Sequence, residues 1–259
     1  MAADVGSVEG ARGGGLCAGC VYLPALLNVG RCIPGDTCIR AHSGRQIDRF
    51  LRANPEEAGA YLDDIFWERR AIAARYAPLT EVMRLKDDPD EVVRRTVALR
   101  LPEDALAGMI GDPDREVRQS VAARVPVPLL PRMMYDPDYV IRATVARRLP
   151  HGQLMALVRD PDREVRKVVA ARLPAFALSR LAGDSAPEVR AIVAERALPG
   201  LAERMLEDAE WWVRLAAVAN ALPEALARVA ATDPEPEVRD AAAARLCDPA
   251  HGHPRGSSS

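Results

Sequence analysis

The sequence predicts an all-α protein in which short helices stack into a solenoid, and three observations support this prediction. Aromatic residues are only 4% of the 259-residue chain, so the core must form by close packing of small and medium apolar side chains. Residues that start and stop helices lie close together along the chain, so each helix must be short. Isolated short helices are marginal in water, so these helices must stack on one another. A Val-Arg or Ile-Arg pair also recurs every 24 or 25 residues, with its arginine at Arg94, Arg118, Arg142, Arg166, Arg190, Arg214 and Arg239.

Each unit of this repeat reads approximately D-P-D-x-E-V-R-x-x-V-A-x-R-L-P. The first aspartate is the expected N-cap, with proline as the first helical residue. The second proline ends the helix because it lacks a backbone N–H. About ten residues then remain, enough for a short second helix or a 3₁₀ turn. The expected N-caps are Asp112, Asp136, Asp160 and Asp233, and the prolines that end helices are Pro102, Pro126, Pro150 and Pro174.

Composition divides the chain into four parts. Residues 1–15 are rich in glycine and are expected to be disordered, and residues 248–259, with His251 and His253, are expected to form a flexible tail. Residues 16–67 hold a cysteine cluster and a linking helix with Asn54 as its N-cap, and residues 68–247 hold eight repeats. The linking helix is expected to cap the array through an apolar stripe of Ala58, Tyr61, Leu62, Ile65 and Phe66.

The arginine of each Val-Arg pair falls inside the apolar arc of its helix at 100° per residue. An unpaired guanidinium would be costly there, so we expect it to bond to an aspartate or a backbone carbonyl of the adjacent unit. The alternative is that these arginines line a ligand surface. Phosphate tracking has no support from net charge, because residues 69–247 contain 28 Lys and Arg against 27 Asp and Glu.

Four cysteines lie within 22 residues near the start of the chain, and they indicate metal chemistry. Cys17 and Cys20 form a Cys-x₂-Cys hook, and Cys32 and Cys38 follow with gaps of eleven and five residues. Four cysteines suit either a structural zinc ion or an iron–sulfur cluster, and the spacing leaves both open. The five-residue gap between Cys32 and Cys38 favours the cluster, because zinc is usually held by two short hooks. Cys247 is expected to be a passive thiol at the end of the last helix.

This cysteine head, joined to 24-residue D-P-D-x-E-V-R repeats, resembles the leucine-rich repeat variant family over about residues 16–247. The resemblance implies a right-handed superhelical solenoid of alternating α and 3₁₀ helices in two layers. It also implies a four-iron, four-sulfur cluster held by Cys17, Cys20, Cys32 and Cys38. His42 is the alternative ligand, but four cysteines already complete such a cluster.

We expect no catalytic role, because the sequence lacks a phosphate-binding glycine loop and a nucleophile elbow. The leading interpretation is a cytoplasmic scaffold that binds a protein partner and carries a structural or redox-sensing 4Fe-4S cluster. The alternatives are electron transfer, a redox-controlled nucleic-acid binder and a structural zinc site. No stretch approaches the roughly 20 apolar residues of a membrane span, so no membrane partner is expected.

Overall fold

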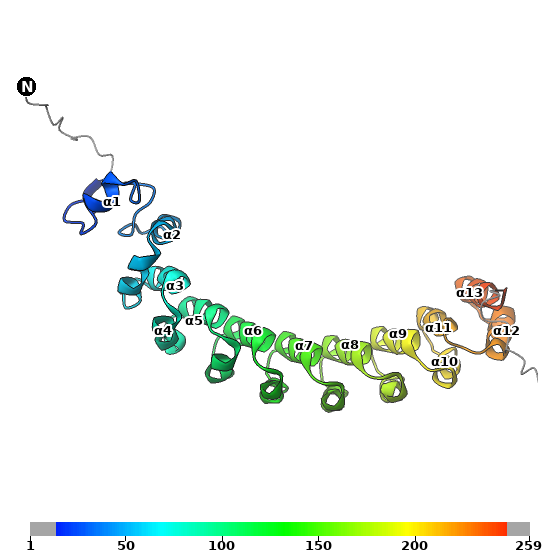
Figure 1. The fold of residues 1–259 in the computed structure, drawn as a ribbon. Coiled ribbons are helices and arrows are strands. Elements are labelled where there is room, and N and C mark those ends of the chain that lie inside the picture. The colour runs from blue at the N-terminus through cyan, green and yellow to red at the C-terminus, as the bar shows by residue number, and fades with distance from the viewer. Residues whose placement is uncertain (1–13, 248–259) are drawn as a thin grey trace, which may run out of the picture. The chain divides into compact units, whose positions relative to one another are not determined.

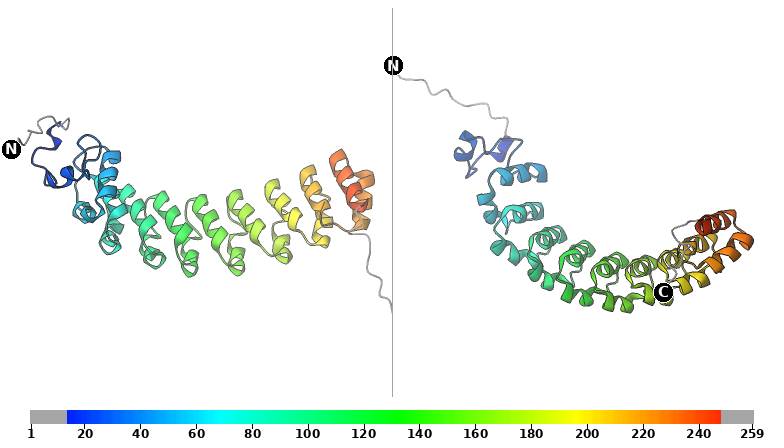
Figure 2. Two further views of the ribbon diagram at one scale, coloured as in Figure 1. Left: turned by 45° about the horizontal axis from the view of Figure 1, so that its top comes forward. Right: turned by 45° about the vertical axis from the view of Figure 1, so that its right-hand side comes forward.

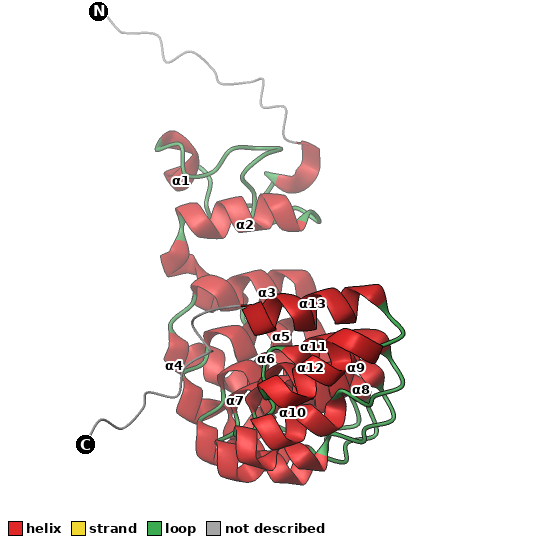
Figure 3. Cartoon of the chain, turned by 90° about the vertical axis from the view of Figure 1, so that its right-hand side faces the viewer, coloured by secondary structure: helices red, strands yellow, loops and turns green. Residues whose placement is uncertain are grey.

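The computed structural model describes residues 14–247, and its helices are joined by short loops and turns (Figures 1 and 3). No strand is present in this range, as the all-α prediction requires; one isolated bridge joins Ile33 and Thr37. The expected flexible tail, with His251 and His253, lies outside the described residues. So does most of the expected disordered start, although Gly14 and Gly15 form a 3₁₀ turn with Leu16.

The chain divides into two compact units, Met1–Pro126 and Val127–Ser259. In the first unit, α2, α3, α5 and α6 follow one another as packed neighbours. The described helices of this unit are η1 (Gly14–Leu16), α1 (Ala25–Asn28), α2 (Gly44–Ala53), η2 (Pro55–Tyr61), α3 (Trp67–Tyr76), α4 (Leu79–Val82), η3 (Met83–Asp87), α5 (Glu91–Arg100), η4 (Glu103–Met109) and α6 (Arg115–Arg124), where η marks a 3₁₀ helix.

In the second unit, α7, α8, α9 and α11 pack side by side in one layer, and the short helices between them form another (Figure 2). The helices are η5 (Val127–Met133), α7 (Tyr139–Arg148), η6 (His151–Leu157), α8 (Arg163–Arg172), η7 (Ala175–Arg180), α9 (Pro187–Arg196), α10 (Pro199–Met205), α11 (Trp211–Val218), α12 (Pro223–Thr232) and α13 (Pro236–Cys247).

Strict alternation of α and 3₁₀ helices holds from η3 to η7, and the short elements α10 and α12 that follow are α-helical. Both begin with proline as their first helical residue. The sequence of α12 is also rich in alanine, which has high helix propensity. The repeats with displaced prolines thus keep the solenoid but change the type of the short helix.

The predicted N-caps are wrong by two residues. The helix after Asp112 begins at Arg115, and the N-cap is Asp114, whose carboxylate accepts a hydrogen bond from the Val117 N–H at 2.9 Å. The first aspartate instead closes the turn before the helix, since its Oδ1 accepts the N–H two residues later, also at 2.9 Å. The intervening Pro113 lies in this turn, outside the helix.

The first aspartate has a second role, which is to receive the arginine of the preceding helix. Arg94 donates from Nε and Nη2 to both carboxylate oxygens of Asp112 at 2.9 and 3.1 Å, and both side chains are buried. This confirms the expectation that the anchor arginines are architectural. The same two-point pair joins Arg70 to Asp88, Arg142 to Asp160, Arg166 to Asp184, Arg190 to Asp208 and Arg214 to Asp233.

Each such aspartate connects two consecutive helices. The carboxylate of Asp160 receives Arg142 from α7, and the backbone carbonyl of Asp160 receives Nη1 of Arg166 from α8 at 2.8 Å. The Asp162 N–H bonds to the same carboxylate. We call this chain of contacts the Arg–Asp ladder, and it fixes the register of one repeat against the next.

A second set of arginines, unforeseen from the sequence, reaches backwards to the preceding helix. Arg172, the last residue of α8, donates from Nη1 to the carbonyls of Ala146 and Leu149 at 2.6 and 2.7 Å. These carbonyls lie at the C-terminal end of α7, where backbone acceptors have no partner within the helix. Positive charge is also favoured there by the helix dipole. Asn220, two residues past the end of α11, takes the place of this arginine and donates to the Glu195 carbonyl at 2.9 Å.

The expected linking helix is also corrected. Pro55–Tyr61 is a 3₁₀ helix, and Asn54 makes no side-chain cap; its amide is buried and donates to the carbonyls of Arg31 and Phe50. Ala58 and Leu62 of the apolar stripe are fully buried, but Ile65 is 97% exposed. The helix ends at Tyr61, so Ile65 lies beyond it in a bend of the chain and does not continue the stripe.

We expect Asp160→Asn to lower the free energy of unfolding by about 3 kcal/mol, because it leaves the buried Arg142 without its carboxylate. Asparagine retains an oxygen for the Asp162 N–H, so the turn itself is preserved. Urea denaturation followed by circular dichroism measures this difference. Glu207→Gln, which removes an exposed ion pair to Arg228, is the control and should change stability by less than about 1 kcal/mol. Equal effects of the two changes would contradict the ladder.

Acid should destabilise the fold by protonating aspartates that pair with arginines. The hydrogen bonds from Arg95, each 2.8 Å long, lower the pKa of Asp114 to about 2. An unfolded aspartate titrates near pH 4. The stabilisation by Asp114 is therefore complete above about pH 4 and is lost as the pH falls towards about 2. Urea midpoints measured across this window should fall less steeply for Asp114→Asn than for wild type; identical slopes would refute the assignment.

Candidate metal centre

The cysteine module, residues 16–67, rests on one buried helix. Ile47, Phe50 and Leu51 of α2 are fully buried, and the ring of Tyr22 packs against Phe50 with centroids 5.1 Å apart. The Tyr22 hydroxyl donates to Glu57 at 2.9 Å and accepts from Tyr61, which ties the cysteine loop to η2. These contacts hold the loop that carries the cysteines against a fixed support.

Two tight turns set the spacing of the cysteines. Between Cys17 and Cys20 the Cys20 N–H bonds to the Cys17 carbonyl at 3.2 Å, and Gly19 has a φ of +65°. Between Cys32 and Cys38, Ile33 and Thr37 exchange backbone hydrogen bonds of 3.0 and 2.8 Å. Side chains other than glycine rarely adopt positive φ, so the hook has its present form because residue 19 is glycine.

The four cysteines predicted from the sequence are brought into one neighbourhood. Cys32 and Cys38 are 8% and 5% exposed, and Cys17 and Cys20 are half-buried. Burial raises the pKa of Cys32, and the negative charges of Cys38, Cys20 and Cys17 raise it further. All three of the other thiols therefore lie within electrostatic range of Cys32.

The donor set fits an iron–sulfur cluster or a zinc ion. Both are held by four deprotonated cysteines, and the residues needed are present on one supported loop. Within residues 14–247, no three His, Cys, Asp or Glu side chains lie close enough together to hold a single metal ion.

Arginines supply positive charge around this loop. Residues 17–52 contain five arginines against two aspartates, a net charge of +3. Arg40 donates to the carbonyl of Ala18, inside the Cys17–Cys20 hook, at 2.7 Å. Arg31 donates to the Ala53 carbonyl at 3.0 and 2.9 Å and pairs with Glu56. A cationic frame of this kind lowers the cost of bringing four thiolates together.

Other residues considered from the sequence have different environments. His42 is exposed, and its ring packs edge-on against Phe66 with centroids 6.1 Å apart. Cys247 is an exposed free thiol at the end of α13, as expected. Sequence reasoning missed the contact of Arg40 with the hook, which joins residues 22 apart, and it gave Asn54 as an N-cap instead of a buried amide that bonds to Arg31.

Comparisons with known proteins match both parts of the chain. Residues 14–60 match the family model described as "LRV protein FeS4 cluster", and residues 92–114, 115–138 and 139–162 match the model "Leucine rich repeat variant". A solved structure, described as a leucine-rich repeat variant with a novel repetitive protein structural motif, is 51% identical to this chain. The match covers 89% of this chain and 98% of the other, with a TM-score of 0.84.

A curated relative is an uncharacterized 27.7 kDa protein in the nifB 3′ region of Rhodobacter capsulatus. It is 38% identical over 86 residues, which are 33% of this chain. The chain spans 35% of that relative's length. Among the described residues, no helix is both long enough and apolar enough to cross a bilayer.

We expect Gly19→Ala to weaken metal retention, because alanine at a φ of +65° costs about 1 kcal/mol and the hook would open to relieve it. Metal bound per chain after passage through a desalting column containing a chelator measures the loss. Gly152→Ala is the matched control, since its φ is not positive and no atom lies within 4 Å of the added Cβ. Equal retention by the two variants would show that the hook is not strained by alanine.

Proposed function

Because the chain belongs to the leucine-rich repeat variant family, we propose that it holds a four-iron, four-sulfur cluster and uses its repeats as a scaffold for a protein partner. The observation that supports the cluster most directly is that Cys17, Cys20, Cys32 and Cys38 all lie inside residues 14–60, the segment that matches the iron–sulfur family model. Two of the four, Cys32 and Cys38, are also buried.

In this proposal Cys17, Cys20, Cys32 and Cys38 are the ligands, each as a thiolate. When bound, the cluster supplies either a one-electron redox centre or a rigid cross-link between two turns. Arg40, held by the carbonyl of Ala18 inside the hook, supplies positive charge there, and Arg31, next to Cys32 in the sequence, is held by the carbonyl of Ala53. All five described cysteines are free thiols, which is consistent with a reducing, cytoplasmic setting.

The scaffold role is supported by side chains that the architecture does not use. The Arg–Asp ladder and the backward arginines occupy the repeat interfaces, whereas other positions differ from repeat to repeat and face solvent. Tyr135 and Phe176 are 76% and 78% exposed, both on the short-helix side of their repeats. Repeat arrays present such positions at regular spacing to an extended partner.

Electron transfer is a second candidate, and the exposure of the cysteine loop favours it. Cys17 and Cys20 are half-buried, and Val21 beside them is 84% exposed. A small apolar face next to a redox centre suits the weak, transient docking of a redox partner. A redox titration distinguishes the two roles: reversible cycling supports electron transfer, whereas breakdown of the cluster on reduction supports a structural role.

Iron and sulfide analysis of protein purified without oxygen tests the cluster. We expect about four iron and four sulfide per chain, with broad visible absorbance from sulfur-to-iron charge transfer. Cys32→Ser should lose most of both, whereas Cys247→Ser, which removes an exposed thiol far along the sequence, should retain them. About one zinc and no sulfide per chain would replace the cluster with a structural zinc site. Iron retained by Cys32→Ser would contradict the ligand set.

A further inference from the structure

A shallow groove separates two neighbouring repeats of the second unit, between η6 and η7. Its volume is about 510 Å³, and Val158, Asp160 and Leu181 contribute to its walls. Arg159 and Arg180 also line it, both exposed, and Ser179 presents its hydroxyl beside them. The two arginines lie just past η6 and at the end of η7.

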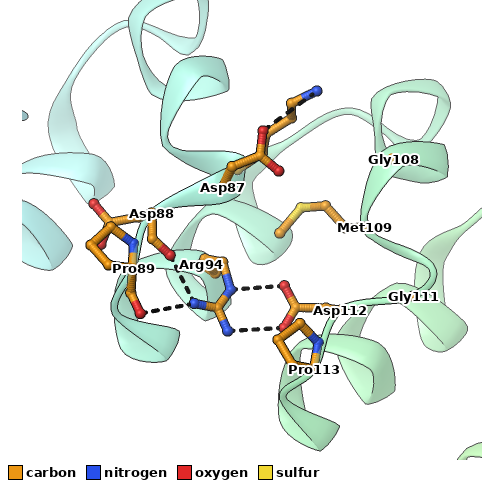
Figure 4. A pocket seen from close by; sticks show the side chains of 10 residues that line it. Asp87, Asp88, Pro89, Arg94, Gly108, Met109, Gly111, Asp112 and Pro113 are labelled. Carbon is orange, nitrogen blue, oxygen red and sulfur yellow. Dashed lines mark hydrogen bonds and ion pairs between the residues drawn. The ribbon is translucent and has the colours of Figure 1, made fainter.

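The first unit contains the equivalent groove 72 residues earlier, with a volume of about 450 Å³ (Figure 4). The ladder aspartates Asp88 and Asp112 lie at corresponding places, and Arg94 bonds to both residues. Lys86 Nζ lies 3.9 Å from Asp87 Oδ2, Arg94 pairs with Asp112, and Asp88 pairs with Arg70 of α3, so the charges at this groove cancel. This groove is therefore a neutral internal reference for the one in the second unit.

The two grooves differ in the charged residues that are not part of the Arg–Asp ladder. Arg159 stands where the reference groove has Asp87, and Arg180 stands where it has Gly108. In the second unit the ladder pairs Arg142–Asp160 and Arg166–Asp184 neutralise the remaining groups. The groove between η6 and η7 thus carries two positive charges that the ladder does not use.

The surroundings of this groove suit an acidic partner. Residues 127–186 contain ten Lys and Arg against six Asp and Glu, whereas residues 187–247 contain seven against eleven. Apolar side chains are exposed on the same two short helices: Phe176 of η7 is 78% exposed and Met155 of η6 is 41% exposed. Cationic and apolar groups together match a peptide with alternating acidic and apolar residues.

We propose that this groove binds an acidic, extended peptide segment of a protein partner, with carboxylates paired to Arg159 and Arg180 and an apolar side chain against Phe176. Arginine favours carboxylates because its planar group makes two parallel hydrogen bonds to them. A nucleic acid would need cations along successive repeats, but the reference groove is neutral and residues 127–247 carry 17 basic and 17 acidic residues. This inference rests on the proposed scaffold role and is independent of the cluster.

Binding of a dye-labelled peptide of alternating glutamate and leucine, followed by fluorescence anisotropy on the full chain, tests the proposal. The double change Arg159→Asp with Arg180→Gly gives these two positions the residues of the reference groove, while Val158 stays where that groove has Lys86, and it should weaken binding about tenfold or more. Arg147→Asp alters an exposed arginine of α7 that does not line the groove, and it should lower affinity less than threefold, the range of a rim charge. Thermal denaturation of each variant shows that the fold is retained.

The reverse exchange provides a gain of function. Asp87→Arg with Gly108→Arg should create a second peptide site in the first unit, and the Cβ added at Gly108 meets nothing closer than Lys86 Nζ at 3.9 Å.

Wild-type protein that does not bind the peptide, or a groove variant that binds it as wild type does, would overturn the proposal. Equal binding of a glutamine-for-glutamate peptide would also overturn it. Tighter binding of a labelled oligothymidylate, lost in the same variant, would assign the groove to nucleic acid instead. Iron and sulfide content is unaffected by these changes, so failure here is distinct from failure of the cluster.

Discussion

The aspartate that opens each repeat is the contact on which the fold depends. In Asp160 the carboxylate receives the guanidinium of the preceding helix and the carbonyl receives that of its own helix. A buried ion pair adds little net free energy over apolar packing, but breaking one is costly. The ladder therefore contributes register more than stability: a stack built from alanine, valine and leucine could slip, and a two-point arginine contact allows one alignment of neighbouring helices.

This arrangement separates the arginines by role. Those of the Val-Arg pairs and of the helix ends are held by aspartates and carbonyls, and their charges serve the stack. Arg159 and Arg180 belong to neither set, and both are exposed. The net charge of the array is near zero, but its cations are of two kinds: one set holds the stack together, and a smaller number are available to bind a partner.

The repeat period, the all-α class, the helix ends at proline and the architectural role of the anchor arginines were predictable, because each depends on local chemistry repeated many times. The N-cap was misplaced because Asp112 and Asp114 are equally good caps locally, and the choice is made by an arginine 18 residues away. Ile65 was placed in an apolar stripe because the helix was expected to continue past Tyr61, where the chain instead forms a turn and a bend. The cysteines were found by spacing, but the local pattern gave Asn54 as an N-cap, and its contact with Arg31, like that of Arg40 with Ala18, joins segments more than 20 residues apart.

The cysteine module adds to this repeated architecture a loop that carries four cysteines, and we propose that Cys17, Cys20, Cys32 and Cys38 hold an iron–sulfur cluster there. X-ray absorption at the iron edge of the full chain, prepared without oxygen, tests this claim most directly. The account predicts iron surrounded by sulfur, with a second shell of neighbouring iron atoms. Zinc bound by sulfur, with no iron signal above background, would contradict it.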